Sequence, residues 1–279
     1  MIPFSFEYHR PASVSEAVSL YAALEAAGKA PVYYAGGSEL LSMARANSLR
    51  FGAAIDIKAI PEARGVEQGG EGIVFGAAAS LSEVIRSNAF PLLSKLAARV
   101  ADHTMQERIT LGGNLMGTIV YREAALAFLL AQSDVVYADA EGAHTAAFSS
   151  LFHGRLTLPA AALLLRVRAA RADAQLPYLH AKKTKYEKID YPLLTLAGVG
   201  REGGMHIALS GYAAYPFCSA ALDAALNDCG KSAEERARSA ADAVKELAQS
   251  DLSGSAGYRR FALYTALLSA LEREEPCFR

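Results

Sequence analysis

The chain has 279 residues, of which 52% are hydrophobic and 20% are charged, and its formal net charge is -1. This length and apolar content suffice for two domains with substantial cores, and a charge near zero does not favour binding to nucleic acid or to an anionic membrane. No apolar stretch reaches the roughly 18 residues of a membrane span, and the N-terminus lacks the pattern of a secretory signal, so we expect a cytoplasmic protein without a membrane span.

The apolar patterns within residues 1–60 predict, in chain order, a helix over 13–27, a strand at 32–35, a helix at 40–46 and a strand at 53–57. Further along, they predict a strand at 72–78, helices at 81–86, 92–100 and 122–131, and strands at 134–138 and 163–167. A run rich in arginine and alanine then indicates a domain boundary near residue 172.

Beyond this boundary, the patterns predict strands at 178–182, 193–199 and 206–212, and then helices over 217–249 and 257–273. A Gly-Gly pair between the last two strands indicates a hairpin. We therefore expect an α+β chain with one domain over 1–172, divided into subdomains of about 1–60 and 61–172. A smaller domain over 173–279 is expected to hold a three-stranded antiparallel sheet and helices.

Two glycine turns carry the functional signal: Ala35-Gly36-Gly37-Ser38-Glu39-Leu40-Leu41, which follows a strand, and Thr110-Leu111-Gly112-Gly113-Asn114-Leu115. A strand that runs into Gly-Gly-Ser leaves backbone N–H groups free to point at an anion, and glycine allows the ligand a close approach. Two such turns favour a diphosphate, and thus a large nucleotide cofactor. Neither turn matches GxGxxG or GxxxxGK[ST], which disfavours a Rossmann site and an ATPase. The histidines and the three cysteines show no ligand spacing, so no metal site is expected.

The succession AGGSELL, IDI, FGAAASLSEV and TLGGNL resembles the FAD-binding (medium) subunit of the molybdenum hydroxylases, which include the xanthine dehydrogenases and the aerobic carbon monoxide dehydrogenases. The resemblance extends over nearly the whole chain and implies an FAD-binding domain of the PCMH type. It implies molybdopterin on a large partner subunit and [2Fe-2S] clusters on a small iron–sulfur subunit, from which electrons reach FAD and leave to NAD or another acceptor. Xanthine or another purine is the substrate that it favours. Because neither glycine turn contains Cys or His, the FAD is expected to be non-covalent.

The resemblance assigns the FAD diphosphate to Tyr33, Tyr34, Ala35, Gly36, Gly37, Ser38, Glu39 and Leu40, and to Thr110, Gly112, Gly113 and Asn114. It also implies that five further residues lie near the cofactor: Phe75 and Gly76, Leu164 beside the flavin, Lys182 at the flavin end, and Glu123 in place of an aspartate that contacts ribose or ribityl hydroxyls. No residue is expected to be catalytic.

Several alternatives stay open. Glu123 would also suit a helix N-terminus, where its charge complements the helix dipole, and Lys182 begins a basic stretch that would suit a solvated strand edge. Tyr121 and Arg122 stand where the family has small residues, so the flavin contacts are in question. A stand-alone FAD-dependent reductase on a related fold, or a scaffold subunit with a degenerate flavin site, would fit the same motifs.

Overall fold

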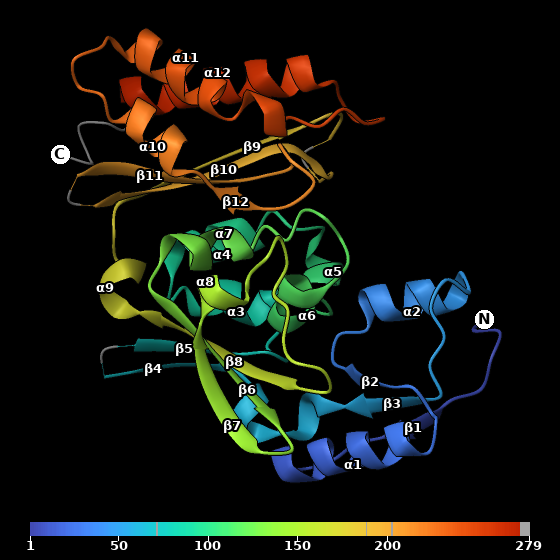
Figure 1. The fold of residues 1–279 in the computed structure, drawn as a ribbon. Helices are drawn as coiled ribbons and strands as arrows, with labels where there is room; N and C mark the ends of the chain where they lie inside the picture. Colours follow the sequence, from blue (N-terminus) through green and yellow to red (C-terminus); the bar gives the residue numbers. More distant parts are fainter. Residues whose placement is uncertain (71, 188, 202, 274–279) are drawn as a thin grey trace.

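The computed structural model describes residues 1–273 apart from positions 71, 188 and 202. Three β-sheets follow one another along the long axis of the molecule, each built from its own part of the chain (Figure 1). The N-terminal sheet lies at one end and the C-terminal sheet at the other, with a larger sheet and its helices between them.

The N-terminal sheet is parallel, with the order β1-β3-β2. Its strands are β1 (Glu7–His9), β2 (Pro31–Tyr34) and β3 (Ala53–Asp56). Helix α1 (Val14–Ala26), capped by the Ser13 hydroxyl, and helix α2 (Ser38–Arg45) flank it on either side (Figure 1). All four residues of β3 are buried, because this central strand is covered on both faces. Two single-turn helices, η1 (Ile57–Ala59) and η2 (Pro61–Ala63), lead out of it.

The middle sheet is antiparallel, with the order β4-β5-β8-β6-β7. Its strands are β4 (Val66–Gly69), β5 (Gly72–Gly76), β6 (Ser133–Asp139), β7 (Gly142–Ala147) and β8 (Leu163–Ala170). One face packs on α3 (Leu81–Ser87), α4 (Pro91–Ala97), α5 (His103–Gln106), α6 (Leu111–Met116), α7 (Ala125–Leu130) and α8 (Phe148–Leu151). On the other face, Val136 and Leu165 join the core of the N-terminal sheet, which fixes the two subdomains together.

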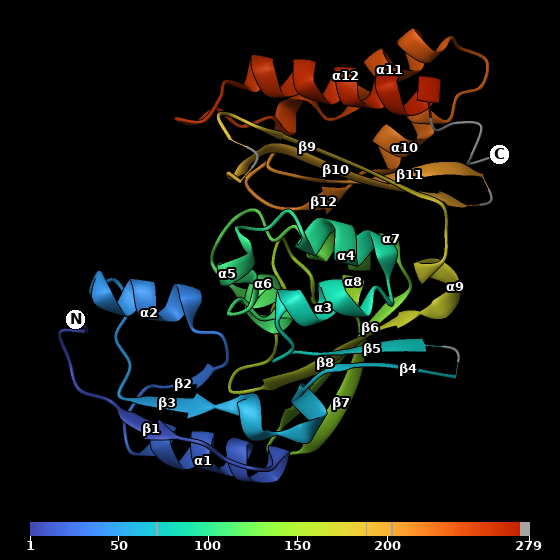
Figure 2. The ribbon, with the colours of Figure 1, turned by 180° about the vertical axis from the view of Figure 1, so that it is seen from behind.

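The C-terminal sheet is antiparallel, with the order β12-β11-β10-β9. Its strands are β9 (Tyr178–Thr184), β10 (Pro192–Arg201), β11 (Gly204–Ser210) and β12 (Phe217–Cys218). Leu194 and Leu196 pack under α10 (Ala220–Leu226), α11 (Ala233–Ala243) and α12 (Ala256–Arg273). Ala197 and Val199 belong instead to the core of the middle domain, whose helices α4 and α7 lie against this face (Figure 2). The two-residue period of β10 thus serves two cores.

The structure confirms the α+β class and the C-terminal antiparallel sheet, with two corrections. The sheet has four strands, because the short β12 pairs with β11, so the expected three-stranded sheet was incomplete. The expected helix over 217–249 is wrong as one element: α10 ends before a turn at Gly230, and Ser232 starts α11 with a capping box. The boundary at 172/173 falls inside the short helix α9 (Arg171–Ala174), and we retain that division as a proposal.

Candidate functional site

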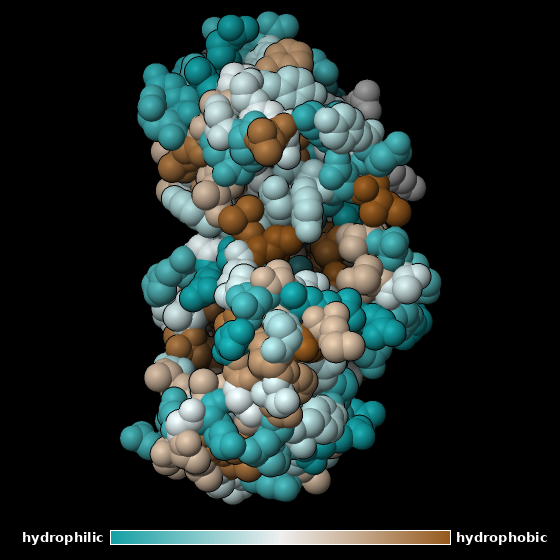
Figure 3. All heavy atoms as spheres, turned by 90° about the vertical axis from the view of Figure 1, so that its right-hand side faces the viewer, coloured by the Kyte–Doolittle hydropathy of each residue, from teal (hydrophilic) through white to brown (hydrophobic). Residues whose placement is uncertain are grey.

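A cavity of about 1130 Å³ lies where the N-terminal subdomain, the middle domain and the start of the C-terminal sheet meet. The side of the molecule on which α2 lies is hollowed at mid-height, and hydrophobic side chains gather in the hollow (Figure 3). The cavity is lined by most of the residues that the sequence singled out: Tyr33, Tyr34, Ala35, Gly36, Gly37, Ser38, Glu39, Leu40, Thr110, Gly112, Gly113, Asn114, Glu123, Leu164 and Lys182. The fold thus brings the two glycine motifs to one site.

Phe75 and Gly76 are not among the described residues that line the cavity. Phe75 is fully buried in the middle core, where its ring meets that of Phe128 edge to face. A Cβ on Gly76 would lie 2.5 Å from the carbonyl oxygen of Ala63, so this glycine allows the chain to pass closely beside η2. Both residues therefore serve packing in this structure.

The two glycine motifs touch through Gly36. A Cβ at this position would lie 1.9 Å from the carbonyl oxygen of Arg108 and 3.2 Å from the backbone nitrogen of Thr110. Any side chain there would separate the loop after β2 from the segment that enters α6. The first glycine of the pair therefore holds the motifs together.

Gly37 and Ser38 begin helix α2. Gly37 is the N-cap, with a left-handed φ of 72°, and a Cβ there would lie 2.4 Å from the ring of Tyr34. The Ser38 hydroxyl oxygen is buried and has no hydrogen-bond partner in the described part of the chain. The N–H groups of a first helical turn have no partner within the helix, and the helix dipole makes this end electropositive. An anion in the cavity would accept hydrogen bonds from the Ser38 hydroxyl and from these N–H groups.

The second glycine pair is helical, although the sequence suggested an open turn. Thr110 is the N-cap of α6, and its hydroxyl oxygen accepts a hydrogen bond from Gly113 N at 3.3 Å. Gly112 N donates to the carbonyl of Ala77 at 2.9 Å, and the Asn114 side-chain oxygen accepts from Ala124 N at 3.3 Å. These groups are therefore already bonded within the protein. The electropositive end of α2 is the better candidate for holding a diphosphate.

The segment after α6 forms a fixed wall of the cavity. The carboxylate of Glu39 accepts hydrogen bonds from Thr118 N at 2.7 Å and from Ile119 N at 3.1 Å. From the C-terminal sheet, the Ser210 hydroxyl donates to the carbonyl of Tyr121. Glu39 thus ties α2 to this wall, a structural role that the glycine motif alone did not reveal.

Tyr121 and Arg122, the unexpected residues of this wall, are both held in place. Arg122 is 6% exposed, has a φ of 32°, and donates to the carbonyls of Gly117 at 3.0 Å and Gly154 at 2.9 Å. The ring of Tyr121 stacks on that of Tyr191, with centroids 4.9 Å apart. Both side chains line the cavity, and the cavity remains large beside them.

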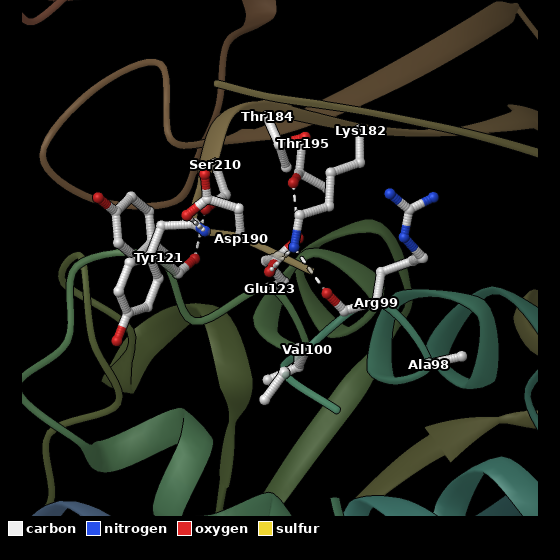
Figure 4. A network of polar contacts seen from close by, with 12 residues as sticks. Ala98, Arg99, Val100, Tyr121, Glu123, Lys182, Thr184, Asp190, Thr195 and Ser210 are labelled. Carbon is white, nitrogen blue, oxygen red and sulfur yellow. Dashed lines mark hydrogen bonds and ion pairs between the residues drawn. The ribbon is translucent and has the colours of Figure 1, made fainter. Parts of the chain in front are cut away.

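Glu123 and Lys182 form a buried ion pair between the middle domain and the C-terminal sheet (Figure 4). One carboxylate oxygen accepts from the Lys182 ammonium at 2.9 Å and the other from the Thr195 hydroxyl at 2.6 Å. The ammonium also donates to the carbonyl of Arg99 at 2.6 Å. The side chains of Lys182 and Glu123 are 1% and 4% exposed, which rules out a solvated strand edge for Lys182.

This pair is also an electrostatic feature of the cavity wall. Burial raises the pKa of the Glu123 carboxyl above its usual range, while the adjacent Lys182 ammonium opposes that rise. The sequence suggested separate cofactor contacts for these two residues, and it gave no sign that they bind each other. Their pairing depends on how β9 lies over the middle domain, which no local motif encodes.

Residues 4–169 match the protein family described as the FAD binding domain in molybdopterin dehydrogenase. The chain belongs to this family. FAD is therefore the cofactor of its N-terminal domain. The carbon monoxide dehydrogenase medium chain of Hydrogenophaga pseudoflava is 39% identical over 119 residues, and that of Afipia carboxidovorans is 30% identical over 118 residues. Each alignment covers 41% of this chain and 40% of the relative, well under half of its length.

Solved structures match this chain over almost its whole length. The carbon monoxide dehydrogenase of H. pseudoflava, in a form lacking the Mo-pyranopterin moiety of its molybdenum cofactor, has a chain with a TM-score of 0.84 and 28% identity, covering 98% of both chains. Quinoline 2-oxidoreductase from Pseudomonas putida 86 matches with a TM-score of 0.85 over 99% of both chains. Its identity of 21% supports the shared fold alone.

The residues present fit FAD. The unpartnered Ser38 hydroxyl and the electropositive start of α2 suit a diphosphate, and the left-handed Gly37 leaves no side chain in its way. Leu164 and Ile57 add apolar surface to the same cavity, as a large aromatic ring system requires.

Proposed function

We propose that this chain is the FAD-binding, electron-transferring subunit of a molybdenum hydroxylase complex. The observation that carries the proposal is the match of residues 4–169 to the FAD-binding family, together with a cavity that both glycine motifs line. When bound, FAD supplies the electron-carrying chemistry, and the chain supplies binding, orientation and electrostatics.

Each part of the cavity has a role in this proposal. Ser38 and the first-turn N–H groups of α2 hold the diphosphate, and Gly36 keeps the two motifs in contact. The Glu123–Lys182 pair fixes the C-terminal sheet over the cavity. The stacked rings of Tyr121 and Tyr191 form part of the wall.

The proposed partners are a small subunit with [2Fe-2S] clusters and a large subunit with molybdopterin. Support comes from the medium chains of carbon monoxide dehydrogenase, whose name implies other chains, and from the sequence resemblance. A purine substrate, NAD as acceptor and a cytoplasmic location are further hypotheses that rest on the sequence, whereas the relatives found are named for carbon monoxide and quinoline. In the part of the chain that the structure describes, no helix is long and apolar enough to cross a membrane.

The scaffold alternative loses its main support. It was suggested by Tyr121 and Arg122, yet both side chains are held against the wall and leave a cavity of about 1130 Å³. The stand-alone reductase differs from the proposed subunit in needing no partner, and the experiment on the isolated chain described below separates the two.

Denaturing the protein is expected to release FAD in unmodified form. Among the described residues that line the cavity there is no histidine or cysteine, so the flavin has no attachment point of the usual kind. Acid precipitation of the purified yellow protein should release all of the flavin into the supernatant as FAD. A pellet that stays yellow would contradict non-covalent binding.

The isolated chain is expected to carry FAD but to oxidise no hydroxylase substrate. The described residues include no cluster of histidine, cysteine or acidic side chains that could hold a metal ion. Purified chain should be assayed with purines, carbon monoxide and quinoline, alone and after addition of the co-purified partner subunits, with metal analysis of each sample. Turnover by the metal-free single chain would favour the stand-alone reductase, whereas turnover only after addition supports the subunit.

A further inference from the structure

Lys58 lies directly behind the first glycine motif, in η1 after β3, and is not among the described residues that line the cavity. Its ammonium donates to the carbonyl of Ala35 at 2.9 Å and to the Asp56 carboxylate at 2.8 Å. It also lies 4.2 Å from the centroid of the Tyr34 ring, within the range of a cation–π contact. One side chain therefore contacts both residues that precede Gly36.

Asp56 holds this ammonium in place. Its side chain is 3% exposed, and it accepts hydrogen bonds from the backbone N–H of Lys58 at 2.9 Å and from the Tyr8 hydroxyl. Burial alone would raise the pKa of the Asp56 carboxyl, but the hydrogen bonds from Lys58 and Tyr8 lower it overall. The carboxylate is therefore ionised at neutral pH, and the lysine is bound at a fixed point on the central strand.

The bond to Ala35 sets the direction of a cavity-lining amide. A trans peptide unit is planar, with its C=O and N–H pointing to opposite sides, and the described residues contain no cis bond. Holding the Ala35 carbonyl on Lys58 thus turns the Gly36 N–H away from Lys58. Gly36 lines the cavity and Lys58 does not, so this constraint favours an N–H that is available to a ligand.

The contact of Lys58 with Tyr34 affects Gly37. The Tyr34 ring lies 2.4 Å from where a Cβ of Gly37 would be, and Gly37 is the left-handed N-cap of α2. A ring held by the Lys58 ammonium therefore supports the turn from which the first N–H groups of α2 emerge.

We propose that Lys58 is a positioning residue for FAD, which presets the Ala35–Gly36 peptide and the Tyr34–Gly37 turn to receive the diphosphate. The inference rests on the proposed placement of the diphosphate at this loop. Preset donors avoid the cost of ordering a loop during binding, so the effect belongs to cofactor affinity.

The test compares Lys58→Met and Lys58→Arg with Lys29→Met as the matched control. Lys29 carries an ion pair with Glu7 on the same subdomain at 2.8 Å and is not among the described residues that line the cavity. The affinity of each apoprotein for FAD is measured by flavin fluorescence at low and high salt, and the unfolding temperature of each apoprotein is recorded.

The expected result is a roughly tenfold loss of FAD affinity in Lys58→Met at both salt concentrations. Lys58→Arg should recover most of it, because a guanidinium can also donate to a carboxylate and a carbonyl. The apoprotein of Lys58→Met should unfold at a lower temperature than that of Lys29→Met, because the buried Asp56 carboxylate loses its counter-charge, and Lys58→Arg should restore the unfolding temperature as well. The affinities are therefore compared well below the unfolding temperature of every apoprotein. A loss that vanishes at high salt would mean simple charge attraction, and a fall in apoprotein stability without rescue by arginine would mean a fold anchor; either outcome overturns the inference.

Gly37→Val separates this inference from the placement on which it rests. If Gly37→Val loses FAD while Lys58→Met binds it normally, Lys58 does not position the loop. If both variants bind FAD normally, the diphosphate does not lie at the first motif, and both ideas fail.

Discussion

Replacing Gly37 by valine is expected to abolish FAD binding while most of the fold survives. The φ of 72° costs an L-residue about 1–2 kcal/mol, and the new Cβ would lie 2.4 Å from the Tyr34 ring. Both effects distort the turn from which α2 starts, so the backbone N–H groups at its N-terminus no longer point to one place in the cavity. We expect FAD affinity to fall by at least about 100-fold, which corresponds to about 2.8 kcal/mol.

Gly28→Val is the matched control for this experiment. Gly28 has a φ of 71°, almost the same as that of Gly37, but a Cβ there meets nothing within 4 Å and the residue does not line the cavity. The control should lose stability through backbone strain alone and keep its FAD. Flavin content and circular dichroism of both proteins decide the matter: equal flavin content would show that the first motif is only a turn.

The first glycine motif could be predicted from sequence because its signals are local. A strand, two glycines and a serine at the start of a helix are adjacent in the chain, and the structure brings them to the cavity in that order. The long helices and the buried strands of the middle and C-terminal sheets were predictable for the same reason. The two-residue β12 and the short edge strand β4 carry too little periodicity to be recognised.

The sequence could not show which residues contact each other across distant segments of the chain. The glycines at 112 and 113 look like the first pair, yet packing against Ala77 and the cap at Thr110 place them in a helix with their N–H groups already bonded. Glu39 lies within the predicted loop but contacts a wall 79 residues further along the chain. In each case the motif residues line the cavity, whereas their contacts within it depend on segments distant in sequence.

Lys182→Met is expected to destabilise the apoprotein by about 3–5 kcal/mol near neutral pH, because it leaves the buried Glu123 carboxylate without its counter-charge. Adding Glu123→Gln should recover much of this loss, since an amide can still accept the Thr195 hydrogen bond and carries no charge to desolvate. Lys183→Met is the control, because this neighbouring side chain on β9 is exposed. Denaturant unfolding of the four proteins, all free of FAD, provides the comparison.

The pH dependence of this loss of stability follows from the protonation of the Glu123 carboxyl. Burial raises the pKa of Glu123 in the folded protein above its ordinary value of 4.5, and removing Lys182 removes the main opposing effect. A raised folded pKa gives stability that is present below the unfolded pKa and lost as the pH rises through the folded one. The cost of Lys182→Met should therefore be smallest below about pH 4.5 and grow towards pH 8, and Glu123→Gln should flatten this trend. A cost independent of pH, or one that Lys183→Met reproduces, would show that Lys182 acts through packing rather than as the partner of a buried carboxylate.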